Sequence, residues 1–273
     1  MDINAIIKYF GLHEHPFMTS PDPRFLYFSS QVKEALAKCE FMARDRVGPI
    51  YMYGPIGSGK TSLVRRLQEK RSQDKHYNVK LLISPNVKSG NAFLRLILET
   101  FDVKTERSYI ASLENFEKFL TKQFQENKIP VLLIDEAQYM NCDALKLIHY
   151  LLNFETNKTK LLQIVLVGQE ELGTKILQYK ELASRMFPIS MNAMSLVDLQ
   201  DMINFRLNVS GYRGELFEDG ETSYKTLYSY TKGLPRDAIK VCFELFIELA
   251  ASGKKQANAK HVEEIAKGQN LRI

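Results

Sequence analysis

The residues from Gly54 to Thr61, which read GPIGSGKT, fit the pattern G-x-x-x-x-G-K-[ST] of a phosphate-binding loop. The glycines allow backbone N–H groups to wrap around a triphosphate, and the start of the following helix adds the positive end of its dipole. We expect Lys60 to reach the β- and γ-phosphates of ATP and the Thr61 hydroxyl to ligate Mg²⁺. The predicted nucleotide-binding residues are Gly54, Pro55, Ile56, Gly57, Ser58, Gly59, Lys60, Thr61 and Ser62.

Two carboxylates form a second candidate group. Asp135 and Glu136 directly follow the apolar run Val131 to Ile134, which is typical of a parallel strand buried on both faces. Open α/β sheets bind their ligands at the C-terminal ends of the strands. Asp135 can therefore hold Mg²⁺, directly or through water. Glu136 is placed to polarise an attacking water molecule as a general base.

The elements that must position these residues follow an alternating pattern. An apolar run over 49–53 predicts a strand directly before the phosphate loop, and a helix follows from residue 62; a chance glycine-rich turn would lack these flanks. Gln169 follows Gly168 at the end of another apolar run, where it would lie near the γ-phosphate or simply end a strand in a turn. The pattern predicts further strands over 79–83, 130–135 and 161–167, and helices over 92–98, 113–124 and 143–154.

The predicted domains divide the chain three ways. Strand signals stop near residue 195, where Ser195 caps the first of several helices. We predict an α/β nucleotide-binding domain with a parallel sheet over 31–193 and a small all-α lid over 194–273. An N-terminal arm over 1–30 carries aromatic residues between prolines. It is expected to pack on the nucleotide domain, beside the adenine or simply as a terminal segment.

The composition is that of an ordinary globular protein. The 273 residues include 37 basic and 32 acidic side chains, a net charge of +5, which permits a nucleic-acid partner without requiring one. Cys39, Cys142 and Cys242 lack metal-ligand spacing and are expected to be buried thiols. No apolar run reaches 18 residues, and the N-terminus is too polar for a secretion signal. These features predict a cytoplasmic protein with no membrane partner.

Taken together, these motifs resemble those of the AAA+ ATPases. The match extends to the ExeA/TnsC-type branch, whose entry signature resembles residues 10–12, 16–17 and 21–27. The resemblance covers roughly residues 8–250 and continues through LIDEAQ (133–138), LLNFET (151–156), VGQ (167–169) and GLPR (233–236).

The resemblance implies roles for individual residues. Lys60 and Thr61 match the Walker A pair, and Asp135 and Glu136 match the Walker B pair. Gln169 falls at the sensor 1 position, where many relatives carry Asn, Thr or Ser.

The resemblance also implies two functional arginines. Arg236 matches sensor 2, a lid arginine that contacts the γ-phosphate. Arg185 stands where an arginine finger would reach the site of a neighbouring subunit, with Arg206 and Arg213 as nearby alternatives. Asn86, after the second strand, could hold Glu136 inactive until a partner binds.

The first function that the resemblance implies is a slow, assembly-regulated ATPase that controls transposition. Such proteins form homo-oligomers, as rings or helical filaments, on duplex DNA with ATP. They recruit a transposase to a target chosen by another protein, and hydrolysis drives disassembly. Lys104, Arg107 and Lys122 are the candidates for contacts with the DNA backbone, or else are solvated surface charges.

The second implied function is an ExeA-type ATPase that assists the assembly of a secretion system. Those proteins usually continue into a membrane segment and a cell-wall-binding domain. The sequence ends at Ile273 with neither, which favours the first function. A loader-type ATPase serving replication or defence is a further alternative.

Overall fold

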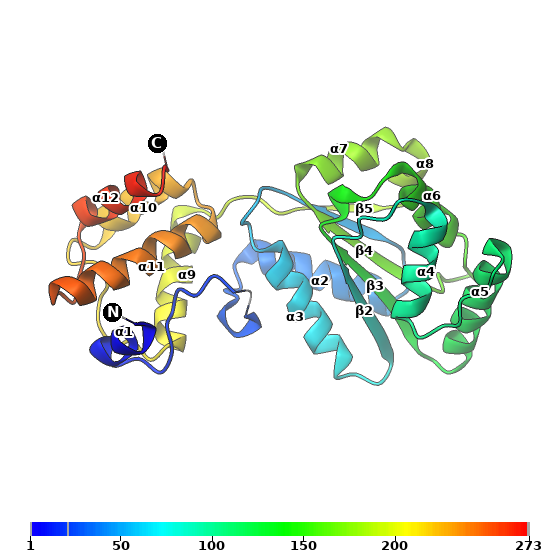
Figure 1. Cartoon of the computed structure of the whole chain (residues 1–273), viewed down its shortest axis with the longest axis horizontal. Helices are drawn as coiled ribbons and strands as arrows, with labels where there is room; N and C mark the ends of the chain where they lie inside the picture. The colour runs from blue at the N-terminus through cyan, green and yellow to red at the C-terminus, as the bar shows by residue number, and fades with distance from the viewer. Residues whose placement is uncertain (1, 21, 272–273) are drawn as a thin grey trace. The chain divides into compact units, whose positions relative to one another are not determined.

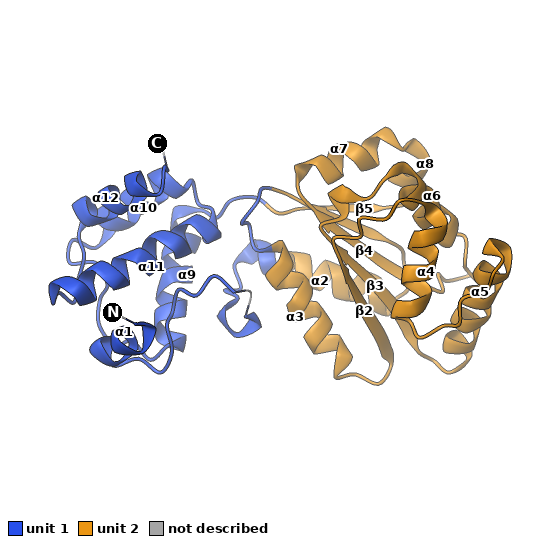
Figure 2. Cartoon of the chain, in the orientation of Figure 1, with its two compact units in different colours: residues 1–32, 55–59, 192–273 blue, residues 33–54, 60–191 orange. Residues whose placement is uncertain are grey.

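The computed structural model describes residues 2–20 and 22–271, so Pro21 of the N-terminal signature lies outside the described residues (Figure 1). The chain forms two compact units, shown in different colours in Figure 2. Unit 1 comprises Met1–Val32, Pro55–Gly59 and Asn192–Ile273, and unit 2 comprises Lys33–Gly54 and Lys60–Met191.

Unit 2 is built on a five-stranded parallel sheet with the strand order β2-β3-β4-β1-β5. Parallel pairing confirms the predicted α/β fold. The expected strands are β1 (Ile50–Tyr53), β2 (Tyr77–Ile83), β3 (Ile129–Asp135) and β4 (Gln163–Gly168), and β5 (Phe187–Ser190) is an additional edge strand. Every residue of β3 and β4 is buried, as their apolar runs predict.

Helices lie on both faces of this sheet, with α3 on one face and α4 and α6 on the other (Figure 1). Parallel strands require such crossover connections, and the helices bury their apolar faces against the strands. The helices predicted after the phosphate loop and over 92–98, 113–124 and 143–154 are confirmed as α3, α4, α5 and α6, and α7 is an addition. Their bounds are α2 (Ser30–Arg44), α3 (Lys60–Ser72), α4 (Gly90–Thr100), α5 (Tyr109–Gln125), α6 (Cys142–Leu151), α7 (Glu170–Gln178) and α8 (Lys180–Ala183).

Unit 1 is helical in its C-terminal part, as expected. The side chain of Ser195 accepts a hydrogen bond from the Asp198 amide, which is the predicted cap of α9. The last segment of unit 1 begins at Asn192, two residues before the predicted start of the lid at residue 194. Its helices are α1 (Ile3–Phe10), α9 (Leu196–Val209), α10 (Glu221–Thr231), α11 (Pro235–Ser252) and α12 (Ala259–Gly268).

The N-terminal arm belongs to a different unit from the one predicted. Its buried residues Ile6, Phe10 and Phe17 belong to the hydrophobic core of the C-terminal helices, so residues 1–30 are not an arm of the nucleotide domain. The ring centroids of Phe10 and Phe17 lie 4.5 Å and 5.4 Å from that of Phe246 on α11. The physical reason is that α1 is amphipathic, and its apolar stripe is buried in that core.

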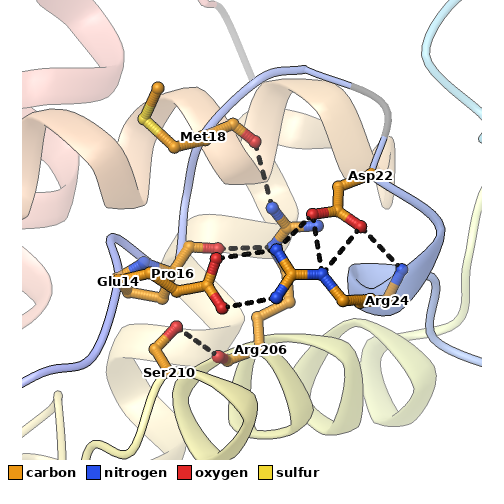
Figure 3. A network of polar contacts seen from close by, with 7 residues as sticks. All are labelled: Glu14, Pro16, Met18, Asp22, Arg24, Arg206 and Ser210. Atoms are coloured by element: carbon orange, nitrogen blue, oxygen red, sulfur yellow. Dashed lines mark hydrogen bonds and ion pairs between the residues drawn. The ribbon is translucent and has the colours of Figure 1, made fainter.

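Arg206 fixes the arm to α9 within unit 1 (Figure 3). Its guanidinium donates to the backbone carbonyls of Pro16 at 2.8 Å, Met18 at 3.0 Å and Phe25 at 3.2 Å. The side chain is buried, and its charge is satisfied by these carbonyl dipoles. Arg206 is therefore a structural residue and not an alternative arginine finger.

Two smaller expectations concern the cysteines and the membrane. Cys39 and Cys242 are buried as predicted, but Cys142 is exposed, because it is the first residue of α6 and faces away from the core. Among the described residues, no helix combines the length and the apolar character that a membrane crossing needs.

Candidate nucleotide-binding site

The predicted site residues of unit 2 meet at the C-terminal edge of its sheet. The strand β4 lies between β1 and β3, and all three run parallel. The phosphate loop follows β1, Asp135 ends β3, and Gln169 follows β4. Since these three strand ends are neighbours, the sheet brings the loop, the carboxylates and Gln169 to one place.

The start of the phosphate loop is tightly constrained. Gly54 has φ +157°, and a Cβ at this position would lie 1.9 Å from the Met191 carbonyl oxygen, so only glycine fits. The Lys60 side chain is buried, and its ammonium group donates to the Gly54 carbonyl at 2.9 Å. A phosphate oxygen could replace the Gly54 carbonyl as the acceptor for this ammonium group.

Thr61 and Asp135 form the pair that fits Mg²⁺. The Asp135 carboxylate accepts hydrogen bonds from the Thr61 hydroxyl and from the Glu136 amide. Burial raises the pKa of Asp135, and the Thr61 hydrogen bond partly opposes this effect. One hydroxyl and one carboxylate are hard oxygen ligands, and they suit an ion that keeps several water and phosphate ligands. Among the described residues, no group of three or more His, Cys, Asp and Glu side chains is placed to hold a metal ion.

Glu136 stands directly after β3 with its backbone in the left-handed region, at φ +55°. Its carboxylate Oε2 accepts a hydrogen bond of 2.5 Å from the side-chain amide of Gln138, a buried residue of the short 3₁₀ helix Ala137–Tyr139. Asn86, which the sequence suggested as the partner of Glu136, is exposed. The partner that the structure gives to Glu136 is thus Gln138.

Gln169, the predicted sensor 1 residue, follows β4, the strand between β3 and β1. It precedes α7, and its backbone N–H donates to the side-chain oxygen of Gln138 at 3.1 Å. Its role in hydrolysis stays a prediction. Gln138, which contacts both Glu136 and Gln169, was not among the predicted site residues, although its place two residues after Glu136 in DEAQ was available as a signal.

Arg236, the predicted sensor 2, begins α11 and contacts the tip of the phosphate loop within unit 1. Its backbone N–H donates to the Gly57 carbonyl at 3.3 Å. A Cβ at Gly57 would lie 2.8 Å from the Cβ of Arg236, so the close approach requires glycine at this position. The Arg236 side chain is exposed.

Arg185, the predicted finger, is not brought to the site of its own chain. It lies between α8 and β5, is exposed, and donates to the Asn153 side chain at 2.6 Å. The strand β5 pairs in parallel with β1, from Phe187 beside Ile50 to Ser190 beside Tyr53. Arg185 therefore stands at the N-terminal edge of the sheet, on the order of 10 Å of strand length away from the phosphate loop.

The predicted DNA contacts are all exposed. Lys104 forms an ion pair with Glu106 at 3.0 Å, and Lys122 approaches Glu126 at 4.0 Å. Arg107 lies in the loop between α4 and α5. Surface pairs of this kind contribute little to stability, so these cations could exchange their partners for phosphates. The role of all three residues in DNA binding stays a prediction.

Comparison with known proteins places this site in a family. Residues 43–176 match the family described as AAA domain. The chain is 30% identical over 251 residues to general secretion pathway protein A of Aeromonas hydrophila, an alignment that covers 90% of this chain. It spans about half of that relative, 45% of its length.

Solved structures show the same fold at low sequence identity. An Aeropyrum pernix ORC2 protein, in ADPNP and ADP complexes, is 14% identical with a TM-score of 0.62, over 87% of this chain and 67% of that one. Drosophila ORC bound to DNA is 19% identical with a TM-score of 0.65, over 89% of this chain and 61% of that one. The RuvB Holliday junction branch migration motor of Thermotoga maritima is 18% identical with a TM-score of 0.60, over 90% of this chain and 70% of that one.

The family match and the arrangement of the strand ends agree. The matched residues contain the phosphate loop, Asp135, Glu136 and Gln169. Residues 43–176 are thus an AAA+ ATPase domain, in a chain that is homologous to general secretion pathway protein A and has a P-loop α/β fold with a helical C-terminal part.

Proposed function

We propose that this protein is an ATP-dependent assembly switch, in which each ATP site is completed by a second copy of the chain. The observation that carries this proposal is the separation of the site residues between two edges of one sheet. Lys60, Thr61, Asp135 and Glu136 gather at the C-terminal edge, and Arg185 lies at the other. An arginine in that position lies away from the phosphate loop of its own chain, and we assign it to the site of a neighbouring subunit.

The residues at the C-terminal edge would act on ATP as follows. The loop amides and Lys60 hold the phosphates, and Thr61 and Asp135 hold Mg²⁺, which when bound neutralises charge on the phosphate oxygens. Glu136 accepts a proton from a water molecule whose oxygen forms a bond to the γ-phosphorus. The bond from the γ-phosphorus to the β–γ bridging oxygen breaks, and ADP and phosphate leave.

Two arginines would link this chemistry to assembly. Arg185 of one subunit stabilises the charge on the γ-phosphate of its neighbour. Arg236, whose backbone contacts Gly57, responds to the nucleotide at the phosphate loop. ATP then favours the homo-oligomer, as a ring or a helical filament, and hydrolysis weakens it.

The partner of the assembled form would be duplex DNA. Lys104, Arg107 and Lys122 offer exposed cations that can follow a phosphate backbone without reading bases. The resemblance to transposition regulators adds a transposase, recruited at a target site chosen by another protein. The fold shared with ORC bound to DNA is compatible with this function.

A second candidate function is assistance in assembling a secretion system. It is favoured by the 30% identity to general secretion pathway protein A, whose name refers to secretion. In this case the switch would use the same ATP site and the same trans arginine, and its assembly would not depend on DNA.

One experiment tests the proposal and separates the two candidates. The particle size is measured by light scattering and negative-stain microscopy, with and without a non-hydrolysable ATP analogue, each with and without duplex DNA. Assembly that requires both ligands is expected for the DNA-based switch. Assembly with nucleotide alone supports the secretion function. A monomer under all four conditions contradicts the assembly switch itself.

A further inference from the structure

Gln138 connects the two strand ends that carry the proposed base and the proposed sensor. Its side-chain nitrogen donates to Glu136 Oε2 at 2.5 Å, and its side-chain oxygen accepts from the Gln169 backbone N–H at 3.1 Å. The residue is buried, whereas Glu136 is half-buried. One amide group thus links the end of β3 to the end of β4.

The position of this amide is fixed on two sides. A Cβ at Gly168 would lie 2.6 Å from the Gln138 side-chain oxygen, so the glycine leaves just enough space for the amide. The ammonium group of Lys175 on α7 donates to the backbone carbonyls of Gln138 at 2.5 Å and of Met140 at 2.9 Å. A side chain whose backbone and oxygen are both held can orient a neighbouring group.

Both contacts require the same orientation of the amide. In the opposite orientation its oxygen would face the Glu136 carboxylate, and its NH₂ group would face the Gln169 N–H, so both contacts would become repulsive. Glutamine satisfies both at once, because it carries a donor and an acceptor. Glutamate would keep only the acceptor, and methionine would keep neither.

We propose that Gln138 is the positioning residue of the general base. By holding Oε2 of Glu136, it sets the direction in which Oε1 faces the attacking water molecule. Because the same amide accepts from the start of α7, a shift of β4 or α7 changes the position of Glu136. This inference rests on the proposed ATP hydrolysis by Glu136, and it adds a residue that touches neither ATP nor the water molecule.

The competing explanation is that Gln138 only fixes β4 to the 3₁₀ helix. The variants Gln138→Glu and Gln138→Met separate the two explanations, because each explanation predicts a different ranking of the two variants by their loss of turnover. A purely structural role through Gln169 predicts that Gln138→Glu, which keeps the acceptor, is the milder change. A positioning role predicts that Gln138→Glu is at least as severe, because it loses the donor and places a second carboxylate beside Glu136.

The experiment measures ATP turnover by the full chain, together with the affinity for a fluorescent ATP analogue. We expect Gln138→Glu to lower kcat about 10- to 100-fold, with ATP affinity within about twofold of the wild type. Gln125→Glu, at an exposed site on α5, is the charge-matched control and should leave both unchanged. A Gln138→Glu enzyme that is more active than Gln138→Met overturns the inference.

A second measurement needs neither activity nor a change at position 138. The side-chain amide resonance of Gln138 is observed by ¹H–¹⁵N NMR in the nucleotide-free protein and in Glu136→Ala. We expect the resonance to move when the carboxylate is removed. An unchanged resonance overturns the contact on which the inference depends.

The proposed function and this inference fail in different ways. If Glu136→Gln hydrolyses ATP at the normal rate, the assignment of the base is wrong. If Glu136→Gln is inactive and Gln138→Glu has normal turnover, only the role of Gln138 is wrong.

Discussion

The two edges of the sheet in unit 2 differ in how much of the proposed site each carries. The C-terminal edge holds Lys60, Thr61, Asp135 and Glu136, each tied to a neighbour by hydrogen bonds. The N-terminal edge holds Arg185, whose side chain has one described hydrogen bond, donated to the Asn153 side-chain oxygen. The first edge is organised in advance to bind a nucleotide, and the second presents an exposed cation. This difference is what a site shared between identical subunits requires.

Lys60→Ala should have the largest effect at the C-terminal edge. It removes the buried ammonium group that faces the phosphates, so ATP affinity should fall about 10²-fold or more. Assembly should be lost together with ATP binding. Nucleotide titration and light scattering on one sample check both results. Normal ATP affinity in this variant would show that the loop does not hold the phosphates.

Glu136→Gln should separate binding from hydrolysis at the same edge. Without the base, turnover should fall about 10²- to 10⁴-fold, whereas ATP still binds and the assembled form accumulates. Steady-state phosphate release and particle size give the two readouts. A variant that hydrolyses ATP normally would assign the base to another residue.

Arg185→Ala tests the N-terminal edge alone. Turnover should fall by roughly 10²- to 10³-fold if the arginine stabilises charge on the γ-phosphate of a neighbour, and ATP affinity should change little. Mixing these subunits with Glu136→Gln subunits should restore part of the activity, because one interface then combines an intact Glu136 with an intact Arg185. Absence of rescue at every mixing ratio would argue against a finger supplied in trans. Arg95→Ala, at an exposed arginine on α4, is the matched control.

Asn153→Ala should give the smallest effect of the four. It removes the hydrogen bond that holds Arg185 but keeps the guanidinium group. A lost surface hydrogen bond to a charged group corresponds to roughly 1 kcal/mol, or about a fivefold change in assembly affinity at most. The ATP concentration at half-maximal assembly measures this shift. An effect as large as that of Arg185→Ala would assign a direct role to Asn153.

The sequence was a good guide where the structure depends on local patterns. The long apolar run of β3 and the Ser195 cap of α9 were both predicted, because each is visible in residues that lie next to one another in the chain. The strand β5 was missed, because its four residues include Pro188 and only Ile189 is buried. A short edge strand of this kind has no distinct sequence signal.

Features that depend on distant partners could not be predicted in the same way. The partner of the N-terminal arm is a core built mainly from residues beyond 192, and no local pattern indicates which unit an amphipathic helix will join. Gln138 gains its importance from Gln169, 31 positions later in the chain. The residue types of the candidate site were visible in the sequence, whereas the contacts between their side chains were not.

The joining of the N-terminal arm to the C-terminal helices has a consequence for synthesis on the ribosome. Residues 33–191 must be translated before the core partners of Ile6, Phe10 and Phe17 exist, which takes roughly 10–30 s at typical rates of chain growth. Unit 2 can fold during that interval, whereas Ile6, Phe10 and Phe17 have no native core to enter. A segment that is translated before unit 2 therefore reaches its native environment only after unit 2 is complete, and in the meantime its exposed apolar side chains can be bound by chaperones.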